Sequence, residues 1–239
     1  MSFTSAKVRD CAARDVRGSR LVSGAGPVLE VSELVVGYGG RAVVRLPALN
    51  LSAAEGLLLT GPSGSGKTSL LLAISGMMQP MAGLIGILGV DPATLKPAER
   101  DRFRGLNIGF VFQNLNLIAG LTALENVLIG AFAAGVPQDR ERATALLAEM
   151  GLAAFAGRRA EALSRGQAQR VALARAMLLG PKLILADEPT ASLDDQNCEV
   201  VGALLARAMS ETGAALLVAT HDRRLRERFA RSVSVEGMS

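Results

Sequence analysis

The sequence contains a glycine-rich segment whose residue types and spacing suit phosphate binding. Residues 61–68 read G-P-S-G-S-G-K-T, which matches the pattern G-x-x-x-x-G-K-[S/T]. Glycines let successive backbone N–H groups point inward around an anion, and the start of the following helix adds a partial positive charge. Lys67 can reach the outer phosphates, and the Thr68 hydroxyl can ligate Mg²⁺. We therefore predict a nucleoside triphosphate site formed by Gly61, Ser63, Gly64, Ser65, Gly66, Lys67, Thr68 and Ser69.

An acidic pair follows a second apolar run, in the segment L-I-L-A-D-E-P at 183–189. A strand that ends in a carboxylate places Asp187 at the carboxyl edge of a sheet, where ligands of α/β folds bind. Asp187 then suits Mg²⁺, and Glu188 can polarise an attacking water as a general base. Alone, this pattern is typical of any strand that ends in an acidic loop, so the prediction depends on the phosphate-binding segment.

A second anion site is predicted at L-S-R-G-Q, residues 163–167. Ser164 has the type and place of a helix N-cap, and Gly166 leaves backbone amides accessible behind it. In isolation this is a well-capped helix. Beside a phosphate loop, it indicates that the phosphates are approached from two opposite sides.

Three further side chains are candidates for the same site. His221, the only histidine, follows the apolar run 215–219, and Gln113 ends the predicted strand 107–113. Each can contact the γ-phosphate or the attacking water. Tyr38 lies among glycines, which predicts an exposed ring available for stacking.

The elements that position these residues alternate between strands and helices. Period-two or short apolar runs predict strands, and apolar residues three and four apart predict helices. This alternation indicates an α/β fold with a helical segment inserted between Gln113 and about Gly166. The predicted strands are 28–36, 57–60, 83–90, 107–113, 183–186 and 215–219, and the predicted helices are 68–78, 140–150, 167–179, 200–209 and 223–231.

Composition excludes several other classes of protein. The 239 residues are 49% apolar, with a net charge of +4, so the chain is not of disordered type, and its mild basicity argues against a nucleic-acid footprint. Cys11 and Cys198 lack metal-ligand spacing. The uncharged stretches 68–90 and 105–124 are interrupted by glycine, proline and amides, so we do not expect them to span a membrane. Residues 1–27 are predicted to be a flexible extension without a secretory signal.

Taken in order, these motifs resemble the ATP-binding-cassette ATPases from Val28 to about Gly237. Residues 61–68 resemble Walker A and 183–188 Walker B, while 163–167 are similar to the signature motif, with Arg165 where the commonest form has glycine. In the same comparison Gln113 is the Q-loop glutamine, 192–194 the D-loop, His221 the switch histidine and Tyr38 the adenine-stacking aromatic.

The resemblance implies a fold and a set of roles. The fold is a phosphate-loop ATPase core with a mainly parallel sheet, an antiparallel β subdomain and a helical subdomain at about 114–166, within an ATPase domain at 28–239. Glu188, His221 and Gln113 are the implied catalytic residues, and Thr68, Gln113 and Asp187 the implied Mg²⁺ ligands. The implied nucleotide contacts also include Ser164, Gly166, Gln167 and Asp194.

The resemblance further implies a head-to-tail dimer, formed with a second copy or a paralogous ATPase. Each ATP would lie between Walker A of one subunit and the signature of the other. Closure on ATP would drive an integral membrane permease, with the ATPase held at the cytoplasmic face of the cell membrane.

The segment 110–127, F-V-F-Q-N-L-N-L-I-A-G-L-T-A-L-E-N-V, is similar to the macrolide-exporter and lipoprotein-release group. Export or lipoprotein extraction is therefore the expected process. An importer ATPase, an ATP-gated regulatory scaffold and a soluble cassette acting on nucleic acid or ribosomes remain open alternatives.

Overall fold

The computed structural model describes residues 26–238. Most of the predicted N-terminal extension, with Cys11, lies outside these residues. In the described part, none of the helices is both long and apolar enough to cross a bilayer.

A five-stranded sheet carries the predicted site residues. Its order is β5 (Ile108–Val111), β6 (Leu183–Asp187), β7 (Ala215–Ala219), β3 (Gly56–Thr60) and β8 (Arg231–Ser234), and every neighbouring pair is parallel. Parallel strands present their carboxyl ends at one edge. The segments that follow β3, β5, β6 and β7 therefore meet at this edge, as the sequence predicts.

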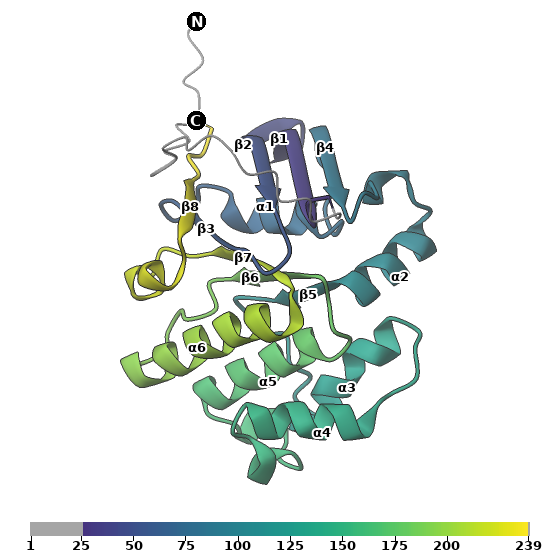
Figure 1. Cartoon of the computed structure of the whole chain (residues 1–239), viewed down its shortest axis with the longest axis vertical. Helices are drawn as coiled ribbons and strands as arrows, with labels where there is room; N and C mark the ends of the chain where they lie inside the picture. The colour runs from purple at the N-terminus through teal and green to yellow at the C-terminus, as the bar shows by residue number, and fades with distance from the viewer. Residues whose placement is uncertain (1–25, 239) are drawn as a thin grey trace, which may run out of the picture.

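A three-stranded antiparallel sheet lies above the first one in Figure 1, in the order β2 (Arg41–Leu51), β1 (Leu29–Tyr38) and β4 (Ala82–Ile87). A tight turn at Gly39 and Gly40, with φ of 57° and 80°, joins β1 to β2. Such left-handed backbone is what a two-residue hairpin requires. Strand β2 was not predicted, because Pro47 argues against a strand, yet an edge strand tolerates it.

Helix α1 (Lys67–Ile74) lies between the two sheets (Figure 1). Its leucines and isoleucine share one buried core with the inner face of the antiparallel sheet and one face of β3, β6 and β7. Burial on both sides explains why α1 shows no amphipathic stripe. The packing fixes the start of α1, and hence the phosphate-binding segment, against the sheet edge.

The opposite face of the parallel sheet is covered by α5 (Arg165–Met177) and α6 (Asp195–Thr212) (Figure 1). Helices α3 (Ala123–Ala133) and α4 (Arg140–Glu149) lie farther from the sheet, where they pack against α5 and each other in the same buried core. Side-chain caps start each of these four helices, from Thr122, Asp139, Ser164 and Asp194. Helix α2 (Pro97–Asn107), which buries no residue, was not predicted, because a solvated helix has no apolar face to detect. Short 3₁₀ turns occupy 92–94, 153–155 and 160–162.

The predicted helix 223–231 is wrong. Residues 223–228 form a 3₁₀ turn, η4, and Arg231 begins β8. Leu225 is the buried residue of that turn, so no apolar stripe exists to support an α-helix. Arg228 pairs with Glu199 and Arg231 with Glu55. Residues 223–231 therefore do not form a basic helix, and two of their arginines are paired with carboxylates.

Candidate functional site

The phosphate-binding segment has the shape expected of an anion cradle. Gly61, Gly64 and Gly66 have φ of 154°, 77° and 91°, and Gly66 caps α1. A side chain at Gly66 would meet Val44, so the loop can approach β2 this closely only with glycine there. Lys67 Nζ donates to the carbonyls of Gly61 and Pro62 at 2.9 Å each, which holds the ammonium over the loop.

A cavity of about 240 Å³ opens beside this loop. It brings together side chains from four segments that follow different strands, as the sequence predicted. Its polar lining comprises Ser63, Ser65, Lys67, Thr68, Ser69, Gln113, Asp187, Glu188 and His221. Val43 of β2 also lines it, which no sequence signal indicated.

Two buried polar atoms in this cavity have no hydrogen-bond partner among the described residues, Ser65 Oγ and Asp187 Oδ1. Asp187 is only 4% exposed. Burial raises the pKa of the Asp187 carboxyl, against the opposing effects of a Thr68 hydrogen bond and the Lys67 charge. A buried polar group without a partner is costly, so these atoms are suited to a ligand that supplies one.

Glu188 is held by several donors. Its Oε2 accepts from the Thr220 hydroxyl at 3.1 Å and the His221 backbone at 3.4 Å, and its Oε1 lies 2.7 Å from His221 Nδ1. Its φ of 46° is unusual for a residue with a side chain. The Glu188 side chain is 9% exposed and that of His221 is 68%. The carboxylate is therefore fixed, while the imidazole faces the opening.

The signature residues do not line this cavity. Ser164 caps α5: its Oγ accepts from the Gln167 backbone at 3.3 Å, and Gln167 Oε1 accepts from the Ser164 backbone at 2.9 Å. Gly166 packs against the Asn197 side chain, which donates to both carboxylate oxygens of Asp194 at 3.0 Å. Asn197 thus places the signature and Asp194 side by side, a contact the sequence did not predict.

Arg165 joins the start of α5 to the Q-loop. Its Nη2 donates to the Gln113 carbonyl at 3.0 Å. Further along α5, Arg175 donates to the carbonyls of Leu115 and Asn116 at 2.6 and 2.7 Å. The glycine-to-arginine difference in the signature therefore adds a contact within the chain. Burial lowers the pKa of the Arg175 guanidinium.

Tyr38 is exposed, as predicted, and its phenol oxygen lies 3.1 Å from Ser69 Oγ on α1. The ring is therefore anchored at one end beside the phosphate loop. Tyr38 is 57% exposed, so part of it stays open to solvent.

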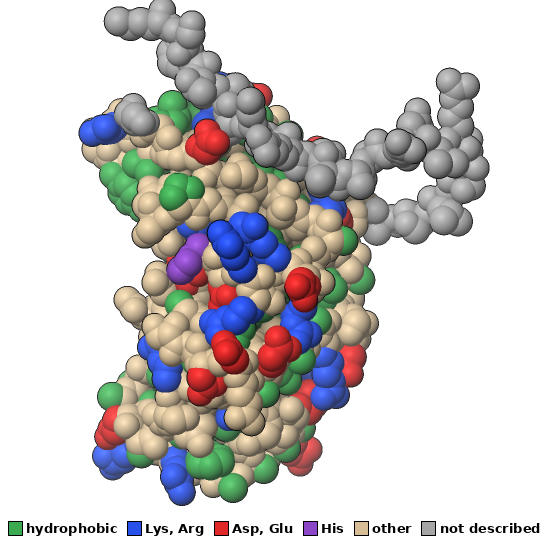
Figure 2. Space-filling model, turned by 90° about the vertical axis from the view of Figure 1, so that its left-hand side faces the viewer, with side chains coloured by type: hydrophobic (Ala, Val, Ile, Leu, Met, Phe, Trp, Pro, Cys, Tyr) green, Lys and Arg blue, Asp and Glu red, His purple; other side chains and the backbone are tan. Residues whose placement is uncertain are grey.

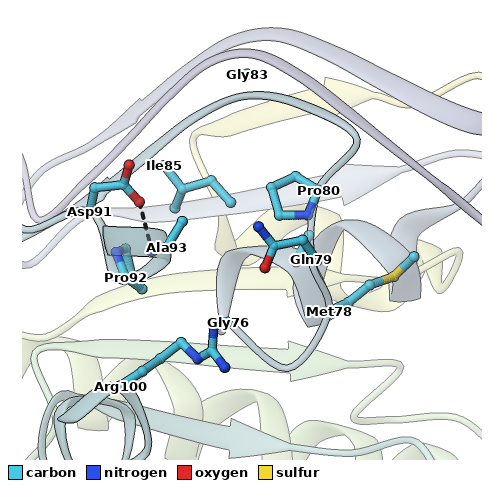
Figure 3. Close-up of a pocket in the computed structure, with 11 residues that line it drawn as sticks. Gly76, Met78, Gln79, Pro80, Gly83, Ile85, Asp91, Pro92, Ala93 and Arg100 are labelled. Atoms are coloured by element: carbon cyan, nitrogen blue, oxygen red, sulfur yellow. Dashed lines mark hydrogen bonds between the residues drawn. The ribbon is translucent and has the colours of Figure 1, made fainter. Parts of the chain in front are cut away.

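A second, smaller cavity of about 30 Å³ lies between α1, β4 and α2 (Figure 3). Apolar groups such as Ile85 and Pro92 line it, and Asp91 accepts from the Ala93 backbone at 2.9 Å. It shares no residue with the phosphate-loop cavity and lacks a glycine-rich anion cradle. We therefore do not assign it to the nucleotide.

The comparisons with known proteins agree with this geometry. The family model described as "ABC transporter" matches residues 46–191. Uncharacterized ABC transporter ATP-binding proteins of Mycobacterium tuberculosis are 45% identical over 203 residues, 82% of this chain, but the match spans only 61% of their length. The lipoprotein-releasing system ATP-binding protein LolD of Anaeromyxobacter dehalogenans is 42% identical over 87% of this chain and 90% of its own.

Solved structures give the same result at the level of the fold. The dimeric structure of a bacterial ABC transporter cassette, MJ0796, has a TM-score of 0.79 and 34% identity, covering 87% of this chain and 94% of that one. A post-hydrolysis dimer of the same cassette, bound to ADP and Pi, has 33% identity and the same TM-score. The two-sheet architecture and inserted helices are those of ABC ATPase cassettes. This chain belongs to the ABC transporter family, as an ATP-binding cassette.

Proposed function

We propose that this chain is the ATP-hydrolysing subunit of a transporter that exports a substrate or extracts lipoproteins or lipids from a membrane. The observation that carries the proposal is the phosphate-loop cavity, where Lys67, Asp187 and the hydrogen-bonded pair Glu188–His221 converge. Such a site can bind the phosphates, hold a metal and position a water.

The residues of the cavity have different roles in the proposed hydrolysis. The loop amides and Lys67 bind the β- and γ-phosphates. Glu188 takes a proton from the attacking water as general base, and Gln113 and His221 orient that water and the γ-phosphate. Thr220 and the His221 backbone hold the Glu188 carboxylate in place, so that little reorganisation precedes the reaction.

The cavity also fits Mg²⁺. Thr68 and Asp187 both line the cavity, and the unpartnered Asp187 oxygen offers the hard oxygen ligand that this ion prefers. We propose Thr68, Asp187 and Gln113 as the residues that hold it. When bound, Mg²⁺ neutralises charge that develops on the phosphates.

We propose that the nucleotide site is completed by a second cassette in a head-to-tail dimer. Ser164, Gly166 and Gln167 lie outside the chain's own phosphate cavity. In the single chain Ser164 and Arg165 are exposed at the start of α5, whereas Gly166 is buried against Asn197, so its amide is not open as the sequence predicted. In such a dimer the start of α5 would lie against the γ-phosphate of the ATP bound by the partner. The phosphate loop of one chain and the signature of the other would then bind the same ATP. Asp194, next to the signature through Asn197, would lie at the same interface.

The proposed partner is an integral membrane permease, which would hold the chain at the cytoplasmic face of the membrane. The relatives named lipoprotein-releasing system ATP-binding proteins, at 40–42% identity, support the extraction process over an importer. Tagged protein purified from membranes should retain an integral membrane subunit and hydrolyse ATP, with hydrolysis lost in Glu188→Gln. Recovery without any membrane subunit would contradict the transporter role. Membrane-bound protein that binds but does not hydrolyse ATP would favour a regulatory scaffold.

A further inference from the structure

A cluster of charged residues lies beside the phosphate cavity and is not used by the proposed chemistry. Arg224, in the η4 turn, contacts three separate groups. It donates to the Asp222 carboxylate at 2.8 to 3.1 Å, to Asp195 Oδ1 at 2.7 Å and to the Leu193 carbonyl at 3.4 Å. Figure 2 shows acidic and basic side chains interspersed near the single histidine, drawn in purple.

Asp222 connects this cluster to the catalytic carboxylate. Its Oδ2 accepts from the Thr190 hydroxyl at 2.7 Å, and its backbone N–H donates to Thr220 Oγ1 at 3.0 Å. The same Thr220 hydroxyl donates to Glu188 Oε2 at 3.1 Å. A continuous chain of hydrogen bonds therefore runs from Arg224 through Asp222 and Thr220 to Glu188.

The Asp222 carboxylate depends on its arginine. Its side chain is 13% exposed, so it needs compensation for lost hydration. The Arg224 hydrogen bonds hold the pKa of Asp222 well below its usual range, against the effect of burial. The planar guanidinium donates hydrogen bonds to both carboxylate oxygens at once. A lysine ammonium does not reproduce this two-point contact.

The other contacts of Arg224 lie at the end of the loop that follows Glu188 and at the first residue of α6. Leu193 and Asp195 flank Asp194, which caps α6. Arg224 thus ties this loop, proposed above to lie at the dimer interface, to the residue directly after His221. A shift of the loop on dimer closure would be passed to the His221–Glu188 pair through one side chain.

We propose that Arg224 is a positioning residue for ATP hydrolysis, which fixes Asp222 and the Leu193 carbonyl to each other so that His221 and Glu188 keep their catalytic geometry. This inference rests on the proposed hydrolysis by this chain. Arg224 does not line the phosphate-loop cavity, so it acts on turnover and not on nucleotide binding.

The test compares Arg224→Gln, Arg224→Lys and the control Arg226→Gln, all measured for ATPase kinetics and thermal unfolding. Arg226 is exposed in the same turn and makes no side-chain hydrogen bond within residues 26–238. We expect Arg224→Gln to lower kcat about 10- to 100-fold, as small misplacements of catalytic groups do, with the KM for ATP within about twofold. Arg224→Lys should recover only part of kcat, and the control should match the unaltered protein.

The single variant Asp222→Asn and the double variant Asp222→Asn/Arg224→Gln, measured in the same way, separate positioning from general destabilisation. If both residues act through one contact, the double variant should be no slower than the slower single variant. Unchanged kcat in Arg224→Gln, a loss fully accounted for by unfolded protein, or additive losses would each overturn the inference. An unaltered protein that hydrolyses no ATP would instead contradict the proposed function.

Discussion

Lys67 is the cation of the phosphate loop, and its environment makes its replacement informative. Its ammonium donates hydrogen bonds to the Gly61 and Pro62 carbonyls, and phosphate oxygens can replace these acceptors when ATP binds. We predict that Lys67→Ala abolishes ATP binding or hydrolysis, because a fixed charge leaves the β/γ-phosphate site. Binding of a fluorescent ATP analogue and ATPase assays check this, with the exposed Lys96→Ala as the matched control. Normal turnover in folded Lys67→Ala would disprove the phosphate-loop assignment.

Glu188 combines burial with a dense set of donors, which suits a base that must not move. Gln keeps the shape of the side chain and removes its basicity. We predict that Glu188→Gln retains ATP affinity while hydrolysis slows about 10²- to 10⁴-fold. The trapped ATP should then favour a dimer, visible by sizing chromatography with Mg-ATP. Glu30→Gln, an exposed change on β1, should behave as the unaltered protein. Hydrolysis at the normal rate in Glu188→Gln would remove Glu188 from its proposed role.

At the scale of elements, the sequence predicted best those strands and loops whose structure depends on their own residues. The strands β3, β6 and β7 are short and apolar up to their last residue, so their own residues predict their burial. The phosphate loop could be predicted for the same reason, since its glycines, lysine and threonine all lie within residues 61–68. The convergence of Gln113, Asp187 and His221 followed from the rule that parallel strands end at one edge, and the cavity confirms it.

Contacts that depend on distant partners could not be predicted. Asn197 lies against Gly166 because α6 packs beside α5, and no pattern in the sequence around Asn197 predicts this contact. Arg224 was assigned to a helix, whereas the structure has it in a 3₁₀ turn, where its side chain makes tertiary bonds to Leu193 and Asp195. Strand β2 forms at a sheet edge although it contains Pro47, because pairing with β1 overrides local preference.

The close approach of β5 to α5 gives a test at this scale. A side chain at Gly109 would collide with the Ala176 carbonyl at the end of α5. We predict that Gly109→Ala destabilises the protein by about 1–3 kcal/mol, because backbone must move to admit the methyl group. Urea unfolding measures this, with Gly157→Ala as the control, since nothing lies within 4 Å of the added carbon there. Equal stability of the two variants would contradict the packing.

At the scale of the whole molecule, the question is whether two chains share each site. Gly166→Asp would place charge at the signature, but it would also displace Asn197 and disturb the cap of α6. Ser164 is a cleaner position, because it is exposed and both Asp and Asn replace it well as an N-cap. The two variants then differ by charge alone. We predict that Ser164→Asp binds ATP normally but fails to close and hydrolyse, because its carboxylate repels the partner's γ-phosphate. Ser164→Asn should retain far more activity, and equal activity of the pair would refute the shared site.

Mixing subunits tests the same arrangement without relying on one substitution. Combining Ser164→Asp with Lys67→Ala produces dimers in which one site has an intact phosphate loop facing an intact signature. The other site of that dimer carries both changes. With random exchange and independent sites, the mixture should reach about a quarter of the unaltered activity, since half the dimers are mixed and each has one working site. Neither variant alone should reach this value. Activity that stays at the level of the separate variants, in samples where light scattering or crosslinking detects mixed dimers, would mean that each chain completes its own site.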